Sequence, residues 1–571
     1  VGTITTQLNA NKGVNIVALG TITVSSVISA GGTEMLTLKA VSDIIINADI
    51  TLTSTGGLTL RANSGSISGS GDLILGGGTT LSIAHGSTLF NDIQLASGGA
   101  TVEFAPLDVE YLVVAGGGGG GGGTASLHGG GGGGGGGVRI GTTSTVTSLG
   151  VVVGNGGAGG AASYSNVTGV IGSKGGDSSF GAITAQGGGG GANFFGGTAT
   201  PGGSGGGGAI SSTSAYRLGA SGTSGQGYAG GNAESGSYDE AAGGGGGGGG
   251  AGSNGSGSTG GAGGIGRYSS ITGSGVYYGS GGGGGGTSGG TGGSSTGGNG
   301  ANSSGSLASS GTNYTGAGGG GGMGTGGSNA TAGAAGSAGV VVVRYWGIDV
   351  ASGGAESAGS GSSAGYRIHR FTNNGTFSLG SFTTLLAGTI SGSGNLAINA
   401  GGGTLTLSGS NSYTGSTTIS DGIVNTNNTS ALGNNSAVTL GSNSGTRLEL
   451  LQDLTIGSLA GGNSTSAQVN LQSSTLTMGA NNISTTFNGR IYGTTSSSIE
   501  KTGLGTLTIT YNPAWADPTV ISGGKLVLQN NAPSPTNKSF SGAGALSIEP
   551  ASTSFSSDFS TSGWTFASTL T

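Results

Sequence analysis

The side chains that most often carry out catalysis are few and widely separated in this sequence. Its 571 residues include no cysteine and three histidines, His85, His128 and His369, none at a metal-binding spacing from another. Asp239 and Glu240 are adjacent carboxylates, but neighbours on an extended chain point in opposite directions, whereas glycosidic cleavage needs two carboxylates facing each other. We therefore predict that the chain is not an enzyme and has no catalytic residue, no metal site and no cofactor.

Five residues that lie between glycine runs could instead contact a receptor. They are Tyr216, Tyr228, Tyr238, Asp239 and Glu240. Tyrosine rings can stack on a ligand while their hydroxyls form hydrogen bonds, and an acidic pair suits a solvated loop. The alternative is that the tyrosines fill gaps against neighbouring segments. We predict these five residues as candidates for receptor contact.

The composition excludes several classes of protein. Glycine supplies 144 residues, charged residues make up 6% and the net charge is −6, so there is no basic surface for nucleic acid. No apolar run is long enough for a transmembrane segment. A chain without disulfides must be held together by packing and main-chain hydrogen bonds. No signal peptide begins at Val1, which we interpret as a processed or partial secreted polypeptide, with cytoplasmic residence as the alternative.

Residues 1–107 alternate apolar residues with serine and threonine, which is typical of strands. Runs of the Leu-Thr-Leu type begin at Leu36, Leu58 and Leu81, at intervals of 22 and 23 residues. An interval near 20 residues suits one rung of a parallel β-solenoid, in which each rung buries its apolar side against the next. The alternative is an antiparallel sandwich with similar strand spacing. The runs resemble the repeats of filamentous-haemagglutinin-like adhesins.

Residues 108–346 hold long glycine runs, including 116–123 and 129–137, between two valine-rich strands. A flexible Gly/Ser linker is the alternative, but a linker does not need closing strands or apolar interruptions such as residues 276–278. Glycine lacks a side chain whose burial could offset its loss of entropy, so ordering must come from main-chain hydrogen bonds. An extended helix of three residues per turn directs its amides at neighbouring chains. The sequence therefore predicts a bundle of polyglycine II helices.

Three segments resemble a known domain. Residues 111–117, Tyr-Leu-Val-Val-Ala-Gly-Gly, and residues 339–345 are similar to the first and last strands of the glycine-rich domain of phage tail adhesins and bacterial surface proteins. Residues 366–377 resemble a strand pair that usually precedes this domain but here follows it, which leaves its sheet partner open. In the phage adhesins, the resemblance implies packed polyglycine helices whose loops contact a receptor.

Residues 403–415 run Gly-Thr-Leu-Thr-Leu-Ser-Gly-Ser-Asn-Ser-Tyr-Thr-Gly and resemble the autotransporter-associated β-strand repeat. A second copy begins at Gly505, with residues 511–515 replacing the Asn-x-Tyr-Thr-Gly turn. The resemblance implies a secreted β-helical passenger. We expect an all-β chain in which β-solenoid or β-sandwich-like regions flank the polyglycine II domain. Its predicted parts are 1–107 (solenoid-like), 108–346 (glycine-rich), 347–400 (connecting strands) and 401–571 (autotransporter-repeat-like).

These patterns predict an extracellular or cell-surface protein. We see no charged, amphipathic capping helix at either terminus, so open rungs could pair between copies and form a homopolymer or homo-oligomer. The first hypothesis is a structural subunit of an extracellular filament or surface layer. The alternative is an adhesin, of the autotransporter-passenger or phage tail-fibre type, that binds a surface glycan or receptor through loops between glycine helices. An enzyme on a β-helix is a third and weaker hypothesis, because acids and bases do not cluster.

Overall fold

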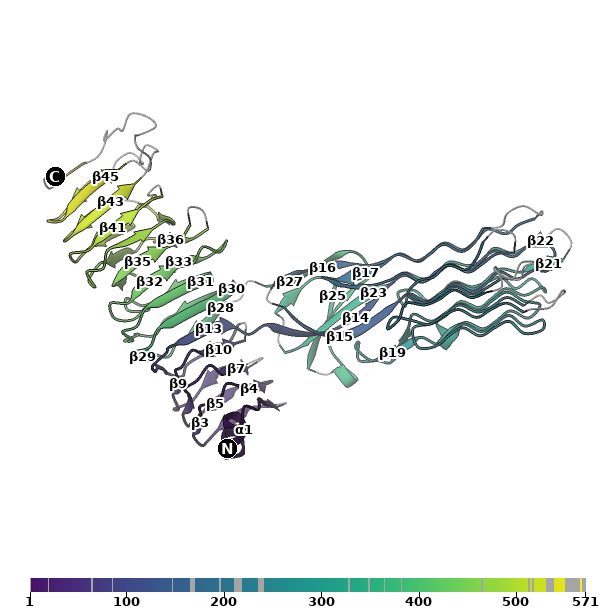
Figure 1. Cartoon of the computed structure of the whole chain (residues 1–571), viewed down its shortest axis with the longest axis horizontal. Coiled ribbons are helices and arrows are strands. Elements are labelled where there is room, and N and C mark those ends of the chain that lie inside the picture. Colours follow the sequence, from purple (N-terminus) through teal and green to yellow (C-terminus); the bar gives the residue numbers. More distant parts are fainter. Residues whose placement is uncertain are drawn as a thin grey trace. The chain divides into compact units, whose positions relative to one another are not determined.

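The computed structural model (Figure 1) divides the chain into two compact units, residues 1–107 with 380–571 and residues 108–379. Each unit is described by itself. Within residues 2–571, the structure describes all positions except 19, 63–64, 85, 146, 165–169, 195–196, 210–217, 235–240, 327–328, 348–349, 364, 381–382, 464–465, 512–513, 516–517, 530–538, 550–564 and 567–571.

The first unit is a succession of short strands that stack in parallel on three faces. The first face contains β1 (Val14–Ala18), β4 (Met35–Ala40), β7 (Gly57–Ala62), β10 (Thr79–Ile83), β13 (Ala100–Phe104), the start of β30 (Leu396–Leu407), the start of β31 (Thr417–Thr426), β32 (Ala437–Leu440), β35 (Ser458–Gly461), β38 (Thr485–Phe487), β41 (Thr506–Ile509), β43 (Lys525–Gln529) and β45 (Ala545–Glu549). The neighbouring strands of this face pair in parallel, from β1 with β4 to β30 with β31.

The second face contains β2 (Ile22–Val24), β5 (Ile44–Ile46), β8 (Ile67–Ser68), β11 (Thr88–Leu89), β28 (Thr383–Leu386), the ends of β30 and β31, β33 (Arg447–Leu450), β36 (Gln468–Asn470) and β39 (Arg490–Tyr492). The third contains β3 (Ile28–Ala30), β6 (Ile50–Leu52), β9 (Leu73–Leu75), β12 (Ile93–Leu95), β29 (Ile390–Gly392), and farther along β34 (Leu454–Ile456), β37 (Thr475–Met478), β40 (Ser498–Lys501), β42 (Thr519–Ile521), β44 (Ser539–Ser541) and β46 (Thr565–Phe566).

The leucines of the predicted repeat form one internal column. Leu36 lies beside Leu58, and Leu58 lies beside Leu81, in the parallel register of the first face. All three side chains are fully buried, and burying a leucine stabilises a fold by roughly 1.5–3 kcal/mol. The β-solenoid prediction is therefore confirmed, and the antiparallel sandwich is wrong for residues 1–107 because the strands pair in parallel.

The solenoid continues across the second unit without losing its register. Val102 of β13 lies beside Ile398 of β30, and Ile93 of β12 lies beside Ile390 of β29. The chain leaves the solenoid after Leu107 and resumes the same three faces after residue 380. The second unit is thus inserted between two consecutive rungs of one solenoid.

A helix covers the first rung. Helix α1 (Gly2–Asn9) buries Leu8 in the solenoid core, and the Asn9 side chain accepts a hydrogen bond from the Gly31 main-chain N–H at 2.9 Å. This helix carries no charged residue, so it is not the charged, amphipathic cap whose absence we expected, but it does cover the rung. Thr and Ile have modest helix propensity, so the segment gives little helical signal, and packing of Leu8 against the rung supplies what local propensity does not.

The second unit begins as two antiparallel sheets. One contains, in order, β15 (Val138–Thr145), β14 (Leu107–Val114), β23 (Val340–Trp346), β26 (Tyr366–Phe371) and β25 (Ala355–Ala358). The other contains β18 (Ile183–Ala185), β17 (Ser178–Phe180), β16 (Leu149–Val152), β27 (Gly375–Leu379) and β24 (Ala351–Ser352). Aromatic contacts join them, with the rings of Tyr111 and Phe180 at 6.4 Å and those of Tyr345 and Phe377 at 6.1 Å.

The strand pair that follows the glycine-rich region has its partners in these sheets. β26 pairs with the closing valine strand β23, and β27 pairs with β16. Residues 347–400, predicted as connecting strands, contribute β24 to β27 to the second unit, and β28, β29 and the start of β30 to the first.

The glycine runs continue from these strands as a hydrogen-bonded lattice (Figure 1). In the segment 116–123, the successive N–H groups of residues 118–120 donate to three different segments, at the carbonyls of Gly134, Ser173 and Ala334, over 2.8–2.9 Å. Each neighbouring segment is contacted again three residues later: Gly118 donates to Gly134, and Gly121 donates to Gly131 of the same segment at 2.8 Å. This repeat of three is the polyglycine II helix.

The carbonyls of the same segment bind three further neighbours. Those of residues 117–119 accept from the N–H groups of Gly157, Gly319 and Gly191 at 2.8, 3.0 and 2.9 Å. The segment is therefore surrounded by six others, of which those at 134, 173 and 334 run antiparallel and those at 157, 319 and 191 run parallel. The predicted packing of polyglycine II helices is confirmed, and its polarity is mixed.

Close approach explains why these positions are glycine. A Cβ on Gly118, Gly119 or Gly120 would lie 2.0–2.1 Å from a carbonyl oxygen of a neighbouring segment. On the outer segment 154–163 every third position is exposed, and those positions are Asn155, Ala158 and Ala161. The positions between them, such as Gly156 and Gly157, face carbonyls of neighbouring segments. Side chains in the lattice are therefore found at its solvent-facing positions or are mostly small where they are buried, as for Ser204 and Ala317.

Candidate binding surfaces

Tyr228 is the one predicted receptor-contact residue within the described part of the chain. Its main chain belongs to the lattice, donating to the Gly247 carbonyl at 3.1 Å and accepting from the Gly205 N–H at 3.0 Å. Its side chain is 52% exposed. The ring thus stands outside a rigid main-chain framework, which would suit ligand contact. Tyr216, Tyr238, Asp239 and Glu240 lie outside the described residues, and receptor contact by the five stays a prediction.

One turn of the bundle is closed by an aromatic contact. His128 and Thr124 pair across the turn, with Thr124 Oγ1 and His128 Nδ1 3.2 Å apart. The His128 ring stacks on Phe194 with centroids 3.8 Å apart. Burial lowers the pKa of His128, which favours the neutral imidazole at pH 7. This histidine therefore holds two turns together.

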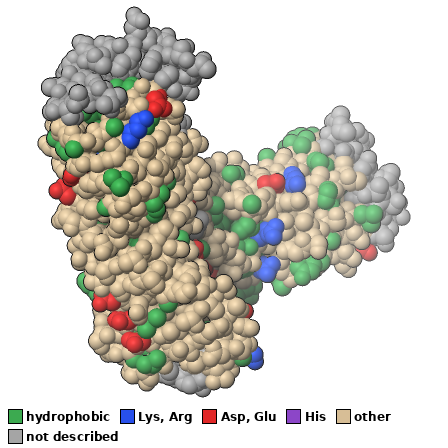
Figure 2. All heavy atoms as spheres, turned by 60° about the vertical axis from the view of Figure 1, so that its left-hand side comes forward, with side chains coloured by type: hydrophobic (Ala, Val, Ile, Leu, Met, Phe, Trp, Pro, Cys, Tyr) green, Lys and Arg blue, Asp and Glu red, His purple; other side chains and the backbone are tan. Residues whose placement is uncertain are grey.

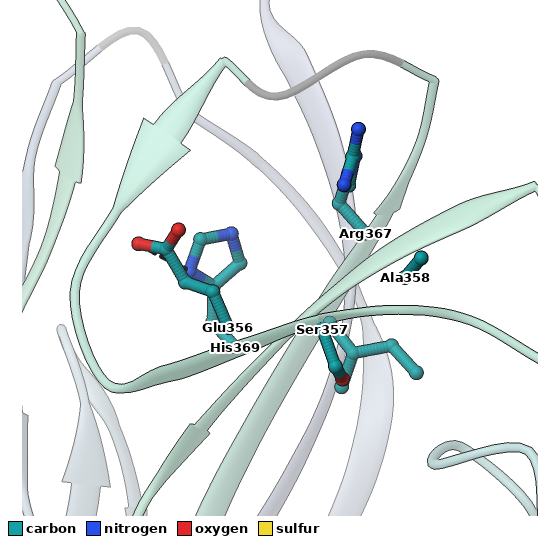
Figure 3. Close-up of a pocket in the computed structure, with 6 residues that line it drawn as sticks. Glu356, Ser357, Ala358, Arg367 and His369 are labelled. Atoms are coloured by element: carbon teal, nitrogen blue, oxygen red, sulfur yellow. Dashed lines mark ion pairs between the residues drawn. The ribbon is translucent and has the colours of Figure 1, made fainter.

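His369 of β26 lies beside Glu356 of β25, its cross-strand partner (Figure 3). It is 1% exposed, its Nδ1 lies 2.9 Å from the Gly353 carbonyl, and its Nε2 lies 3.3 Å from the Tyr345 hydroxyl. Glu356 lies 3.7 Å from the same ring, beside a cavity of about 230 Å³ that Arg367 also lines. The contacts fix the crossover between the two sheets. His85 lies outside the described residues.

A second cavity lies on the opposite side of this sheet. Its volume is about 220 Å³, and its lining includes Glu110, Arg344 and Ser269. Arg344 bonds Glu110 Oε2 through Nε at 2.9 Å and Nη2 at 2.6 Å. The Tyr366 hydroxyl donates to Glu110 Oε1 at 2.8 Å, and Arg344 stacks on the Tyr366 ring at 4.3 Å. These charges are mutually satisfied, so the cluster stabilises the sheet.

Charged side chains are sparse elsewhere, and several lie near one another, as Lys525 and Glu549 do at 3.6 Å and as Asp49, Asp72 and Asp92 do on adjacent rungs. On the face shown in Figure 2, a few small groups of acidic and basic side chains lie on a mostly uncharged surface. Among the described residues, no three side chains of His, Cys, Asp or Glu gather as metal ligands. The surface offers hydroxyls, amides and isolated aromatic rings, which bind a ligand by stacking and hydrogen bonds.

One aromatic surface was not anticipated from the sequence. The sequence marks residues 276–278 only as an apolar interruption of the glycine runs, but β20 (Val276–Tyr278) pairs with β19 (Arg267–Ser269) in a hairpin. Tyr268 and Tyr277 are 57% and 43% exposed. A Tyr-Tyr pair after a valine indicates a strand with one ring on each side, and that was the available signal.

The two autotransporter-like segments share an internal geometry in the solenoid. Tyr413 is fully buried, and its hydroxyl lies 2.5 Å from Thr417 Oγ1. In the second segment Trp515 is 3% exposed, and its Nε1 donates to Thr519 Oγ1 at 2.9 Å. In each segment, therefore, a buried aromatic ring bonds the threonine four residues later. Trp515 thus makes in the second segment the contact that Tyr413 makes in the first.

The Asn of the first segment links three rungs. Asn411 Oδ1 accepts from the Ile390 main-chain N–H at 2.8 Å, and its Nδ2 donates to the Ala431 carbonyl at 2.5 Å. At this turn on the third face, the Asn411 side chain supplies the hydrogen bonds between rungs that main-chain strand pairing supplies elsewhere.

Comparison with known families agrees with this geometry. The model described as passenger-associated-transport-repeat matches residues 398–425 and 499–528. The chain is an autotransporter-like β-helical passenger. The predicted repeats at 403 and 505 of the passenger are thereby confirmed. A model described as a glycine-rich domain matches residues 95–346, from the last solenoid rung before the insertion to the end of strand β23, and so includes the lattice.

The passenger repeats indicate a secreted or surface protein with a structural or adhesive role. No curated protein matches the passenger. Among its described helices, none is long and apolar enough to cross a membrane.

Proposed function

We propose that the passenger is an adhesin whose solenoid is the secreted scaffold and whose inserted unit is the binding module. The observation that carries this proposal is the register across the insertion. β13 pairs with β30, and β12 with β29, as if residues 108–379 were absent. A unit that the scaffold does not need for its own packing is free to serve another purpose.

The lattice of the inserted unit supports a binding role. Its helices are held by main-chain hydrogen bonds, which are independent of the side chains in the turns. Turns of any sequence can therefore be presented on a rigid support, as binding loops are on other scaffolds. Exposed tyrosines such as Tyr228 are found on this unit.

The test compares two forms of the passenger displayed on a bacterial surface. One is the full chain, and the other has residues 108–379 replaced by a short Gly-Ser linker. Adhesion of the cells to host or abiotic surfaces should require the inserted unit, while surface exposure of the solenoid should be equal. Equal adhesion of both forms would contradict the proposal.

The filament hypothesis requires contacts between copies. Helix α1 covers the rung through which copies were expected to pair at this end, so it disfavours end-to-end pairing there. Light scattering and electron microscopy of the purified passenger decide between the filament hypothesis and the adhesin proposal. The adhesin proposal expects single particles, and regular filaments would favour the structural subunit.

A further inference from the structure

The hairpin β19–β20 presents two tyrosines as a preformed aromatic surface. Tyr268 and Tyr277 are direct cross-strand partners, with ring centroids 5.4 Å apart and ring planes at 65°. A Cβ on Gly275 would lie 2.2 Å from the Tyr268 hydroxyl oxygen, so the ring lies against the hairpin main chain. Glycine at this position allows that placement.

The other side of the hairpin is fixed to the sheet. Ile271 and Tyr278 are each 5% exposed and pack with Leu112, Val342 and other apolar side chains of β14, β15, β23 and β26. Arg344 Nη1 donates to the Ile271 carbonyl at 3.2 Å. The exposed rings therefore stand on a rigid base, and little entropy remains to be lost when a ligand binds.

A third tyrosine lies on the adjoining turn. The Gly279 N–H, two residues after Tyr277, donates at 2.7 Å to the carbonyl of Thr315, which directly follows Tyr314. Tyr314 is 38% exposed and has φ of +56°, a left-handed conformation that is uncommon for a bulky residue and concentrates at ligand sites. Arg370 places its guanidinium 5.3 Å from the Tyr314 ring centroid.

We propose that Tyr268, Tyr277 and Tyr314 form a glycan-binding platform. This inference rests on the adhesive function proposed above and names its ligand class. A sugar ring has apolar C–H faces that stack on aromatic rings and hydroxyls that need polar partners. Tyrosine hydroxyls supply such partners, together with the Arg370 guanidinium for an acidic sugar.

The size of the platform favours a glycan over a protein partner. At the observed exposures, three tyrosines offer roughly 300 Å² of surface, whereas a stable protein interface uses about 800 Å² on each side. A proline-rich peptide also stacks on aromatic side chains, and it is the competing outcome of the experiment. The alternative is a purely structural role, in which Tyr268 and Tyr277 only stabilise the hairpin as a cross-strand pair.

The experiment applies the purified full-length passenger to an array of neutral and acidic oligosaccharides. It compares the wild type, Tyr268→Ala, Tyr277→Ala, Tyr314→Ala and the triple variant. We expect binding to at least one oligosaccharide, a loss of about tenfold in affinity for Tyr268→Ala or Tyr277→Ala, and no binding by the triple variant. Phe90→Ala removes a 53% exposed aromatic ring from the solenoid and should bind as the wild type does.

Gly275→Ala keeps all three tyrosines but displaces the Tyr268 ring. It should weaken glycan binding while the melting temperature changes little, which a purely structural role of the tyrosines does not predict. Unchanged glycan binding in the triple variant, absence of binding to every oligosaccharide, or binding only to a proline-rich peptide each overturn the inference.

Cell adhesion separates this inference from the proposed function. If adhesion requires residues 108–379 but survives the triple substitution, the adhesin proposal stands and the platform is wrong. If adhesion does not require residues 108–379, the adhesin proposal is wrong.

Discussion

The Thr389 main-chain N–H donates to the Asp92 side-chain oxygen Oδ1 at 2.7 Å, although 297 residues separate the two in sequence. This bond joins the last rung before the inserted unit to the first rung after it. Along the same edge, Asp49 accepts from the Asp72 N–H at 3.0 Å, so consecutive rungs use the same contact. The rungs on either side of the insertion therefore pack on each other as other consecutive rungs of the solenoid do.

Replacing residues 108–379 by a short Gly-Ser linker should leave a folded solenoid. Closing a shorter loop changes the entropy only slightly, and the pairing of β13 with β30 does not use the removed residues. Circular dichroism should show a β spectrum and a cooperative thermal transition. A spectrum without β structure would show that the inserted unit is needed to fold the scaffold.

A methyl group inside the lattice should destabilise the inserted unit strongly. In Gly120→Ala the new Cβ would lie 2.1 Å from the Gly320 carbonyl oxygen, and the neighbouring helix must move. We expect a loss of about 3 kcal/mol or more in the free energy of unfolding. Gly150→Ala is the matched control, since no atom lies within 4 Å of its Cβ. Chemical denaturation should show the control within about 0.5 kcal/mol of the wild type.

Tyr413 should make the solenoid sensitive to alkali. Burial raises the pKa of its hydroxyl, outweighing the hydrogen bonds from Thr417 and Ser436 that lower it. Below pH 10 the phenol is neutral in both states; above pH 10 it ionises in the unfolded chain first, so stability is lost as the pH rises.

The variant Tyr413→Phe should remove part of this alkaline loss. At pH 7 it should cost about 1 kcal/mol, because Thr417 loses a hydrogen-bond partner. The melting temperature between pH 7 and 11 measures both effects, and the same alkaline slope in the variant would refute the assignment.

Ionisation of Asp72 should destabilise the folded solenoid, whereas ionisation of a carboxylate with a lowered pKa stabilises a fold. Burial, and then the carboxylates of Asp49 and Asp92 on the adjacent rungs, raise its pKa above the usual 3.8. The protonated Asp72 carboxyl therefore stabilises the folded solenoid relative to the unfolded chain below pH 3.8. This stabilisation is lost as the pH rises through the raised pKa of the folded state.

Replacing this group by an amide should therefore stabilise the solenoid at neutral pH. Asp72→Asn should raise the melting temperature by about 1–2 °C at pH 7, since the group is largely solvated. The gain should disappear near pH 3. A lower melting temperature at pH 7 would show that the ionised Asp72 carboxylate is stabilising.

The sequence was informative where it repeats. Leu36, Leu58 and Leu81 predict the rung, because each leucine stacks on its equivalent. The continuity from Val102 to Ile398 was not predictable from spacing, because the inserted residues break the interval. Glycine runs indicate polyglycine II helices through the absence of side chains, but they carry no signal for which segments become neighbours.

The sites were harder to predict than the fold. Tyr228 was identified because it interrupts glycine, and the structure shows its exposed ring. Tyr268 and Tyr277 interrupt glycine too, but their exposure depends on which face of the hairpin packs on Leu112 and Val342, and that is a tertiary property. The sequence indicates only that Trp515 lies in a degraded turn. Its hydrogen bond to Thr519 shows that it takes the place of Tyr413.

The most direct test of the account is hydrogen exchange in the intact passenger. Amides of residues 116–123 and 129–137 should be protected to the same degree as those of the solenoid strands β4 and β7, because their N–H groups bond neighbouring carbonyls. Exchange of these glycine amides at the rate of an unfolded peptide, with protected solenoid strands in the same sample, would contradict the lattice and the binding module built on it.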